Sequence, residues 1–349
     1  MHVVVVGATG NVGTSTVQAL AADPSVTSVL GIARRLPRWH PDKTEWARAD
    51  IGSDDLTPLF RGAGAVVHLA WLFQPTHRPA VTWQTNVLGS ARLFRAVADA
   101  GVPALVHGSS VGAYSPGPAD RAVDETWPTH SWPAAAYGRE KAYVERLLDS
   151  FEAERPGCRV VRLRPGFIFK RESAAQQRRL FAGPLVPGRL AREDLVPVVP
   201  DIPGLRLQVL HSSDVAAAYR LAVTGDARGP FNVAAEPVLD AAELARVLGA
   251  TPVRVPAAVA RAALAAAWHA RLVPADPDLF DLALRLPVMD TSRARRELGW
   301  SPRHSASYAL REFLAGLRGN AGMETPPLAP GTSGFMRIRE LMTGVGGRP

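Results

Sequence analysis

Val3-Val4-Val5-Val6-Gly7-Ala8-Thr9-Gly10-Asn11-Val12-Gly13, at the start of the chain, is the stretch that decides the fold. A β-branched run that is apolar on both faces is typical of a strand buried in a parallel sheet. The three glycines allow a tight turn and let backbone N–H groups approach a pyrophosphate. A helical pattern follows from residue 11 to residue 22 and ends at Asp23-Pro24. The stretch therefore predicts a strand–turn–helix unit that binds phosphate through Gly7, Thr9, Gly10, Asn11, Val12 and Gly13.

Short apolar runs and helical stretches then alternate along the first half of the chain. The runs that predict strands are residues 26–33, 65–70, 104–107 and 159–163, and the main helical stretches are residues 81–100 and 134–153. This alternation is typical of an α/β fold with a doubly wound parallel sheet. We therefore expect a Rossmann-like domain over residues 1–165.

The alternation of predicted strands and helices ends after Pro165. Residues 183–203 are rich in Pro and Gly and predict loops, while residues 214–223, 241–248 and 256–269 predict helices. We expect residues 166–319 to form a smaller, mainly substrate-binding region, with some segments returning to the sheet. Residues 320–349 form a tail rich in Gly, Pro, Thr and Ser that we expect to be partly disordered.

Tyr137 and Lys141 form the most informative pair for chemistry. They stand four residues apart in a predicted helix and so share one face. A tyrosine is a poor base at neutral pH, but a nearby ammonium favours its phenolate. Lysine occurs only three times in 349 residues, so its place after Tyr137 is not expected by chance. The pair predicts that Tyr137 exchanges a proton with a substrate hydroxyl or carbonyl.

With the glycine-rich turn, this pair resembles the extended short-chain dehydrogenase/reductase family, of the NAD-dependent epimerase/dehydratase type. The resemblance covers about residues 1–215 and a stretch near residues 290–300. It implies a Rossmann-like fold, a dinucleotide cofactor and hydride transfer at the nicotinamide. It also implies that Tyr137 and Lys141 contact the cofactor.

Further site residues follow from the same resemblance. Ser110 matches the catalytic serine, and Asn86 matches an asparagine that supports a proton relay. The segments expected beside the cofactor are Asp50-Ile51, Leu69-Ala70 and Pro165.

The end of the second predicted strand bears on the choice between NAD and NADP. An acidic residue there accepts hydrogen bonds from the ribose of NAD and repels a 2′-phosphate. This chain has Ala33 at the matching position, followed by Arg34 and Arg35. Guanidinium groups suit a phosphate dianion, so the sequence favours NADP, with NAD as the alternative.

The sequence indicates the type of reaction less clearly than it indicates the cofactor. Family dehydratases carry an acidic pair where this chain has Val111 and Gly112, which argues against a dehydratase. Trp71 and Phe73 predict either an apolar substrate-binding loop or packing between domains, and the first of these favours a reductase of a small molecule. Arg206, which precedes a His-x-x-Asp segment, matches an arginine that holds the diphosphate of nucleotide sugars. A nucleotide-sugar epimerase with a transient ketone therefore remains the alternative.

Composition excludes some other classes. Hydrophobic residues make up 47% and charged residues 21% of the chain, as in an ordinary globular protein, and no run approaches the roughly 20 residues of a bilayer span. We therefore expect no membrane partner and, because no secretion signal is apparent, a cytoplasmic location. The single cysteine, Cys158, has no companions for a metal site, so no metal is expected.

The net charge of +8 raises a question about partners. The basic residues are scattered, so no nucleic acid is expected as a partner. A non-catalytic protein that senses dinucleotides or binds nucleic acid remains an alternative of another class, although such a protein has no chemical need for Ser110, Tyr137 and Lys141. The family resemblance implies a homodimer that associates through the helices of residues 81–100 and 134–153.

Overall fold

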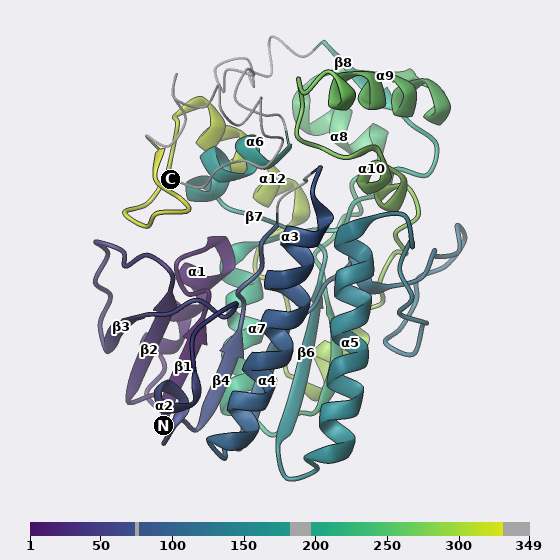
Figure 1. The fold of residues 1–349 in the computed structure, drawn as a ribbon. Coiled ribbons are helices and arrows are strands. Elements are labelled where there is room, and N and C mark those ends of the chain that lie inside the picture. The colour runs from purple at the N-terminus through teal and green to yellow at the C-terminus, as the bar shows by residue number, and fades with distance from the viewer. Residues whose placement is uncertain (74–76, 182–196, 331–349) are drawn as a thin grey trace.

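A parallel sheet of seven strands is the centre of the part of the chain that the structure, a computed structural model, describes: residues 1–73, 77–181 and 197–330. The strand order is β10-β6-β5-β4-β1-β2-β3, and every neighbouring pair is parallel (Figure 1). The strands are β1 (His2–Val6), β2 (Ser28–Ala33), β3 (Thr44–Arg48), β4 (Ala65–His68), β5 (Ala104–Gly108), β6 (Arg159–Pro165) and β10 (Gly229–Val233). This order confirms the expected doubly wound, Rossmann-like fold.

The valine run of β1 explains why this strand lies in the middle of the sheet. Its four valines are at most 1% exposed. Val3 and Val5 belong to the core on one face of the sheet, and Val4 and Val6 belong to the core on the other. Because side chains of a strand alternate between faces, a run of apolar residues supplies both cores at once.

Helices cover both faces of the sheet. α1 (Asn11–Ala21) and α7 (Ser212–Thr224) pack together on one face, with α11 (Ser292–Glu297) beside β10. α2 (Thr57–Phe60), α4 (Gly89–Asp99) and α5 (Ala136–Glu154) cover the other face. Figure 1 shows α4 and α5 in front of the sheet and α7 behind it.

The helix expected over residues 81–100 forms, but it contains a π-helical turn. α3 (Pro79–Trp83) runs into a π-helical turn, η1 (Gln84–Leu88), before α4 begins. Such turns are rare and occur frequently at functional sites. Asn86 lies in this turn and is fully buried.

The remaining elements lie above the carboxyl ends of the central strands (Figure 1). Two short parallel pairs, β7 (Phe167–Phe169) with β9 (Val209–His211) and β8 (Val198–Asp201) with β11 (Thr251–Arg254), belong to this region. Its helices are α6 (Ala174–Phe181), α8 (Ala241–Leu248), α9 (Ala257–His269), α10 (Pro277–Ala283) and α12 (Ala306–Arg318). α7, β10 and α11 follow residue 166 in the chain but return to the central sheet, so the second region is not one continuous segment.

One expectation from composition needs correction, and another can be followed over part of its length. Residues 198–201, within the stretch expected to form loops, form β8 because their backbone pairs with β11. In the expected tail, residues 321–330 pack against the rest of the protein, with Thr325 and Leu328 at most 1% exposed. The rest of both predictions, over residues 182–196 and 331–349, lies outside the described residues.

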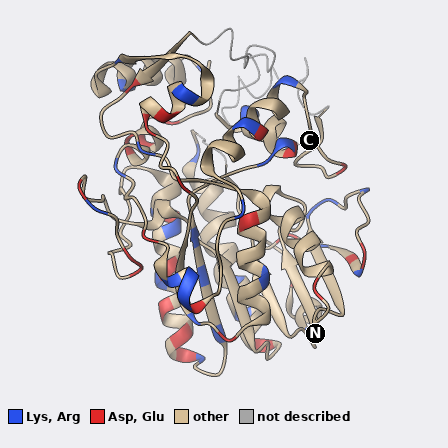
Figure 2. Cartoon of the chain, turned by 180° about the vertical axis from the view of Figure 1, so that it is seen from behind, with Lys and Arg blue, Asp and Glu red and all other residues tan. Residues whose placement is uncertain are grey.

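In the view from behind (Figure 2), both acidic and basic residues are spread over the described part of the chain. Acidic and basic side chains are intermixed along its helices and loops (Figure 2). No helix in the described ranges combines the length and the apolar character that crossing a membrane requires.

Candidate active site

In the turn between β1 and α1, the middle glycine, Gly10, has open space beside it. Gly7 has a φ of +87° and donates its N–H to the carbonyl of Ile32 at 2.9 Å. A Cβ at Gly7 would lie 2.5 Å from the nitrogen of Ala70, and one at Gly13 would lie 2.3 Å from the oxygen of Gly7. A Cβ at Gly10 would meet its nearest neighbour at 3.6 Å. Packing therefore explains Gly7 and Gly13, whereas Gly10 leaves room for a ligand.

The start of α1 suits an anion. The helix begins directly after Gly10, without a side-chain cap and without an acidic residue in its first turn. The first N–H groups of a helix carry a partial positive charge and bind phosphate readily. Two cavities meet at this turn, because Gly7 and Gly10 line both of them. The residues present therefore fit the pyrophosphate of a dinucleotide that extends into both cavities.

We name the first cavity the Arg34 pocket, after the arginine that follows β2. It brings together the residues expected beside the cofactor near its adenosine, Arg34, Arg35, Asp50, Ile51, Leu69 and Ala70, with Gly7, Thr9 and Gly10 of the phosphate-binding turn. These residues follow β1, β2, β3 and β4, whose carboxyl ends meet at this edge of the sheet. Ligands of open α/β sheets bind at such an edge.

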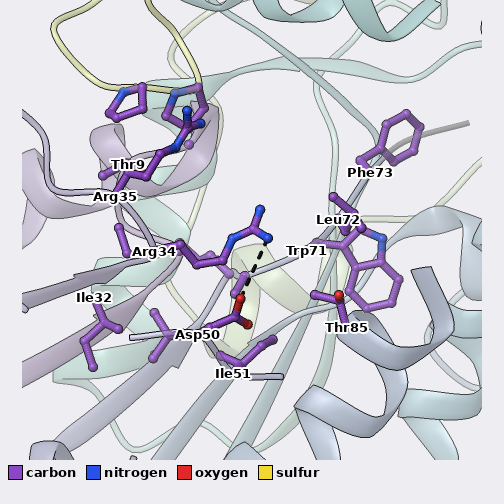
Figure 3. Close-up of a pocket in the computed structure, with 18 of the residues that line it drawn as sticks. Thr9, Ile32, Arg34, Arg35, Asp50, Ile51, Trp71, Leu72, Phe73 and Thr85 are labelled. Atoms are coloured by element: carbon purple, nitrogen blue, oxygen red, sulfur yellow. Dashed lines mark ion pairs between the residues drawn. The ribbon is translucent and has the colours of Figure 1, made fainter. Parts of the chain in front are cut away.

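The two arginines of this pocket point in different directions (Figure 3). Arg34 extends over the pocket, with Nη1 3.9 Å from Oδ2 of Asp50. Arg35 turns away from Asp50 and has no hydrogen bond or ion pair with any described residue. Burial, together with the charge of Arg34, lowers the pKa of Arg35. A bound anion would offset the repulsion between these guanidinium groups.

The reaction end of the site brings together Ser110, Tyr137 and Lys141. Ser110 follows β5, while the other two lie one turn apart near the start of α5. Lys141 Nζ donates to the carbonyl of Gly108 at 2.8 Å, and Ser110 Oγ accepts from the N–H of Gly112 at 3.0 Å. A Cβ at Gly112 would lie 2.8 Å from the ring of Tyr137, so only glycine lets this loop approach the ring so closely.

Burial favours the neutral forms of both Tyr137 and Lys141. Burial raises the pKa of Tyr137 to about 12, although a hydrogen bond with Ser110 acts in the opposite direction. Burial lowers the pKa of Lys141 to about 7, against the attraction of Glu145 and Glu140. Tyr137 therefore keeps its proton at neutral pH, which is the form that can donate to a carbonyl oxygen.

An aromatic loop after β4 covers this pair. The ring centroids of Trp71 and Phe73 lie 6.1 Å and 4.8 Å from that of Tyr137. Lys141 Nζ lies over the face of Trp71, 3.4 Å from the ring centroid. Phe73 also contacts Phe181 of α6, at a centroid distance of 5.4 Å. The loop thus covers Tyr137 and Lys141 and connects them to α6.

Asn86 lies behind this loop and lines neither cavity. Its amide oxygen accepts from the N–H of Leu72 at 2.7 Å, and its Nδ2 donates to the carbonyl of Leu72 at 3.2 Å. Nδ2 also donates to Oε2 of Glu140 at 2.7 Å, while the hydroxyl of Thr82 donates to Oε1 of that carboxylate. In this arrangement Asn86 holds the aromatic loop, and Glu140 holds Asn86.

The second cavity, named the Tyr137 cavity, has a volume of about 530 Å³. At the sheet it is lined by Asn11, Val12, Gly13, Ser110, Tyr137, Lys141 and Pro165, all predicted site residues. Further out, most of its lining is apolar, including Phe73, Phe181, Leu205, Leu207, Leu264, Leu279, Phe280, Leu282 and Leu286. Lys141 is the only cationic residue among the described residues that line it.

Arg206, expected to hold a substrate diphosphate, does not line this cavity. Its guanidinium donates instead to the carbonyls of Ala119 at 2.7 Å and Pro118 at 3.0 Å. Its neighbours Leu205 and Leu207 face the cavity in its place. The structure therefore separates Arg206 from the other predicted site residues.

Sequence reasoning missed three contributions to the site. Glu140 stands between Tyr137 and Lys141 in the sequence, and an acidic residue at that position was a signal that could have been used. Gln176 of α6 lines both cavities. Pro326 and Pro327 line the Arg34 pocket although they follow β2 by almost 300 residues, and no local pattern indicates that contact.

Comparisons with known proteins agree with this geometry. Residues 3–234 match the model of the NAD dependent epimerase/dehydratase family, which confirms the resemblance drawn from the motifs. An uncharacterized protein of Mycobacterium tuberculosis is 26% identical over 329 residues, covering 90% of this chain and 83% of its own length. A 4-hydroxy-2-methyl-3-oxo-4-farnesyl-3,4-dihydroquinoline-1-oxide ketoreductase of Stigmatella aurantiaca is 28% identical over 179 residues, covering 50% of this chain and 52% of its own.

Among solved structures, the UDP-glucose 4-epimerase of Thermus thermophilus in complex with NAD superimposes with a TM-score of 0.68. The sequence identity is 21%, and the match covers 91% of this chain and 99% of that one. At this identity the likeness establishes the fold, and the substrate of the epimerase does not transfer with it.

Proposed function

Because the chain belongs to the NAD-dependent epimerase/dehydratase family, we propose that it is an NADP-dependent oxidoreductase that interconverts a carbonyl and a secondary alcohol in an apolar small molecule. The observation that carries this proposal is the lining of the Tyr137 cavity. Its outer part is built mainly from leucine and phenylalanine side chains, with Gln176, Gln177 and Asp276 as polar members, and Lys141 is its only basic residue among the described residues. Such a wall favours an apolar substrate and offers no partner for a diphosphate.

The residues at the sheet suit proton exchange at the reacting oxygen. Tyr137 holds a proton at neutral pH and can donate it to a carbonyl oxygen as negative charge develops there. Ser110 lies next to Tyr137 and can orient the same oxygen. A bound nicotinamide would supply or accept the hydride. Lys141 would hold its ribose and stabilise negative charge on Tyr137.

The preference for NADP rests on the Arg34 pocket. Ala33 occupies the position where a carboxylate would favour NAD, and Arg34 and Arg35 follow it. Two cations at this place suit a ribose phosphate through charge-assisted hydrogen bonds. Asp50, paired with Arg34, lines the same pocket, where it would be directed at the adenine.

Calorimetric titration with NADPH and NADH, using the Arg34→Ala/Arg35→Ala variant, tests the cofactor. Hydrogen bonds to charged groups contribute about 1.5–3 kcal/mol each, so we expect NADPH affinity to fall at least about 10-fold in the variant. NADH affinity should change little. Arg295→Ala/Arg296→Ala, on α11, removes two exposed arginines away from both cavities and serves as the control. A wild-type preference for NADH that the variant leaves unchanged would refute NADP.

Turnover tests the reaction. Purified protein is incubated with NADPH and a panel of aryl and long-chain ketones, with UDP-hexoses in parallel. We expect NADPH oxidation with the ketones, and a loss of about 10²–10⁴-fold in kcat for Tyr137→Phe. Epimerisation of a UDP-hexose without net change in the cofactor would support the epimerase instead. Tight binding of RNA or DNA with no turnover would favour the non-catalytic class.

A homodimer is a further part of the proposal. The helices that would form the contact carry exposed apolar side chains, with Val81 at 40%, Leu88 at 42% and Tyr143 at 46% exposure. The ring of Trp83 lies 5.0 Å from that of Tyr143, so the two helices present one continuous apolar surface. Such a surface suits a second copy of the chain.

A further inference from the structure

The segment after α12, Ala321–Pro330, lies well beyond the region that matches the family model, which ends at residue 234. We name it the C-terminal strap. Figure 1 shows it, in yellow, leaving α12 and passing towards α1 and the edge of the sheet formed by β2 and β3. It therefore reaches the side of the molecule where the Arg34 pocket opens.

Several contacts fix the C-terminal strap in this position. The N–H of Arg38, after β2, donates to the carbonyl of Glu324 at 3.1 Å. Arg179 of α6 donates to the carbonyl of Pro327 at 2.5 Å, and Lys170 Nζ lies 3.8 Å from the sulfur of Met323. Anchors from the β2–β3 loop, from α6 and from the residue after β7 thus hold one short segment.

The C-terminal strap is also folded within itself. The N–H of Met323 donates to the carbonyl of Leu328 at 3.1 Å, and the N–H of Leu328 donates to the carbonyl of Thr325 at 3.0 Å. Leu328 is fully buried, and Thr325 is 1% exposed. The burial of these two side chains fixes both ends of the Pro326-Pro327 pair, which lies at the surface of the pocket.

The proline pair forms one wall of the Arg34 pocket. Pro326 and Pro327 line it together with Arg34 and Arg35, and Leu180 of α6 completes the same side. Proline has no N–H and a fixed φ, so this wall offers no donor that competes for a ligand and loses little entropy on ordering. It shields the pocket without neutralising its charge.

Arg35 is the residue that this wall affects. It is partly buried, lies beside a second cation, and has no hydrogen bond or ion pair with a described residue. Shielding from water strengthens the attraction between such a group and an anion. We propose that the C-terminal strap is part of the dinucleotide site: it covers the adenosine end and shields Arg35 so that it binds a phosphate monoester on the ribose. This inference rests on the proposed NADP dependence and extends it to residues outside the family region.

Hydrogen–deuterium exchange on the full-length wild-type protein tests the strap without any substitution. The amides of Met323, Glu324, Thr325 and Leu328 are followed without ligand, with NADP and with NAD. We expect their exchange to slow at least about fivefold with NADP and to slow less with NAD. Equal exchange in all three samples would overturn the proposal.

A variant pair tests the same contact by affinity. Pro326→Gly/Pro327→Gly loosens the wall and keeps both arginines, and we expect its dissociation constant for NADPH to rise at least about fivefold. Pro156→Gly/Pro302→Gly carries the same kind of change away from both cavities and should bind as the wild type does. Thermal unfolding of each variant checks that it is folded.

The outcomes separate this inference from the proposed function. The strap variant could bind NADPH as tightly as the wild type while Arg34→Ala/Arg35→Ala loses affinity. This result would overturn the role of the C-terminal strap and leave NADP dependence standing. A wild-type protein that binds NADH more tightly than NADPH would overturn both the NADP proposal and the phosphate role of the strap.

Discussion

Lys141 Nζ lies 3.4 Å from the centroid of the Trp71 ring and donates to the carbonyl of Gly108 at 2.8 Å. The indole therefore covers the amine on one side while the strand β5 holds it on the other. A cation over an aromatic face is stabilised by up to about 2 kcal/mol when it is desolvated. Trp71 is thus a direct neighbour of both Lys141 and Tyr137.

Replacing Trp71 should expose Lys141. In Trp71→Ala the loss of the ring's attraction for the cation would by itself lower the pKa of Lys141. Water that replaces the ring also removes part of the desolvation, which is the largest cause of the shift, so we expect the pKa to rise from about 7 towards its ordinary value of 10.5. The limb of the pH–rate profile that reports Lys141 should move to higher pH, and kcat/KM should fall about 10-fold because the covering ring is lost. Trp71→Phe keeps a ring face and should lie between the two. An unchanged pH profile in Trp71→Ala would contradict this role.

Glu140 should affect both the position of the aromatic loop, through Asn86, and the charge near Tyr137 and Lys141. In Glu140→Gln the negative charge is lost, and with it an interaction that raises the pKa values of both Tyr137 and Lys141. The pH–rate profile should therefore move to lower pH, and KM for an apolar substrate should rise as the loop loosens. Thr82→Val removes a donor to this carboxylate and keeps the charge, so it should raise KM without moving the profile. The opposite direction of the pH shift would refute this account.

Glu145 should make stability depend on pH. It is fully buried, and both its oxygens accept from Arg164 at 3.0 Å. Burial alone would raise its pKa, but the hydrogen bonds and charge of Arg164 lower it to about 2, below its ordinary value of 4.5. A depressed folded-state pKa stabilises the protein above the unfolded-state value, and this stabilisation is lost as pH falls from about 4.5 to about 2.

Denaturant unfolding across this pH range measures the effect. Glu145→Gln leaves Arg164 buried without its carboxylate and should reduce the free energy of unfolding at pH 7 by about 3–5 kcal/mol. It should also reduce the loss in the free energy of unfolding that the wild-type protein shows as pH falls from about 4.5 to about 2. Glu154→Gln, an exposed change on the same helix, should leave both unchanged. If Glu145→Gln loses stability between pH 4.5 and pH 2 as the wild type does, another group titrates in this pH range.

The proposed dimer predicts a change in mass. Leu88→Asp/Tyr143→Asp places two charges on the exposed apolar surface of η1 and α5 and should give a monomer by light scattering. Val259→Asp/Leu272→Asp places charges on exposed apolar residues in and just after α9 and should keep the wild-type mass. A monomeric wild-type protein would remove the dimer from the proposal.

Much of the fold and the centre of the site could be predicted because both depend on local patterns. The valine run before Gly7 defined β1, and the spacing of Tyr137 and Lys141 placed both on one helical face. Strand ends in a parallel sheet meet at one edge, so residues that follow separate strands, such as Asp50 and Ser110, could be assigned to one site.

The direction of single side chains could not be predicted in this way. Arg206 stands at the spacing expected for a ligand to a diphosphate, yet its guanidinium bonds to the carbonyls of Pro118 and Ala119. The bond between Asn86 and Glu140 joins residues 54 apart in the sequence. Neither contact has a local signal, because each depends on how separate elements pack.

Local patterns were enough to predict the sheet, the glycine-rich turn and the helical face shared by Tyr137 and Lys141, because strand burial, glycine spacing and helical periodicity act within a few residues of the chain. The tertiary structure alone decided which groups surround them: the indole over Lys141, the carboxylate behind Asn86 and the proline wall beside Arg35. Those contacts join distant segments, and packing between layers selects them from many arrangements that the same local patterns would allow.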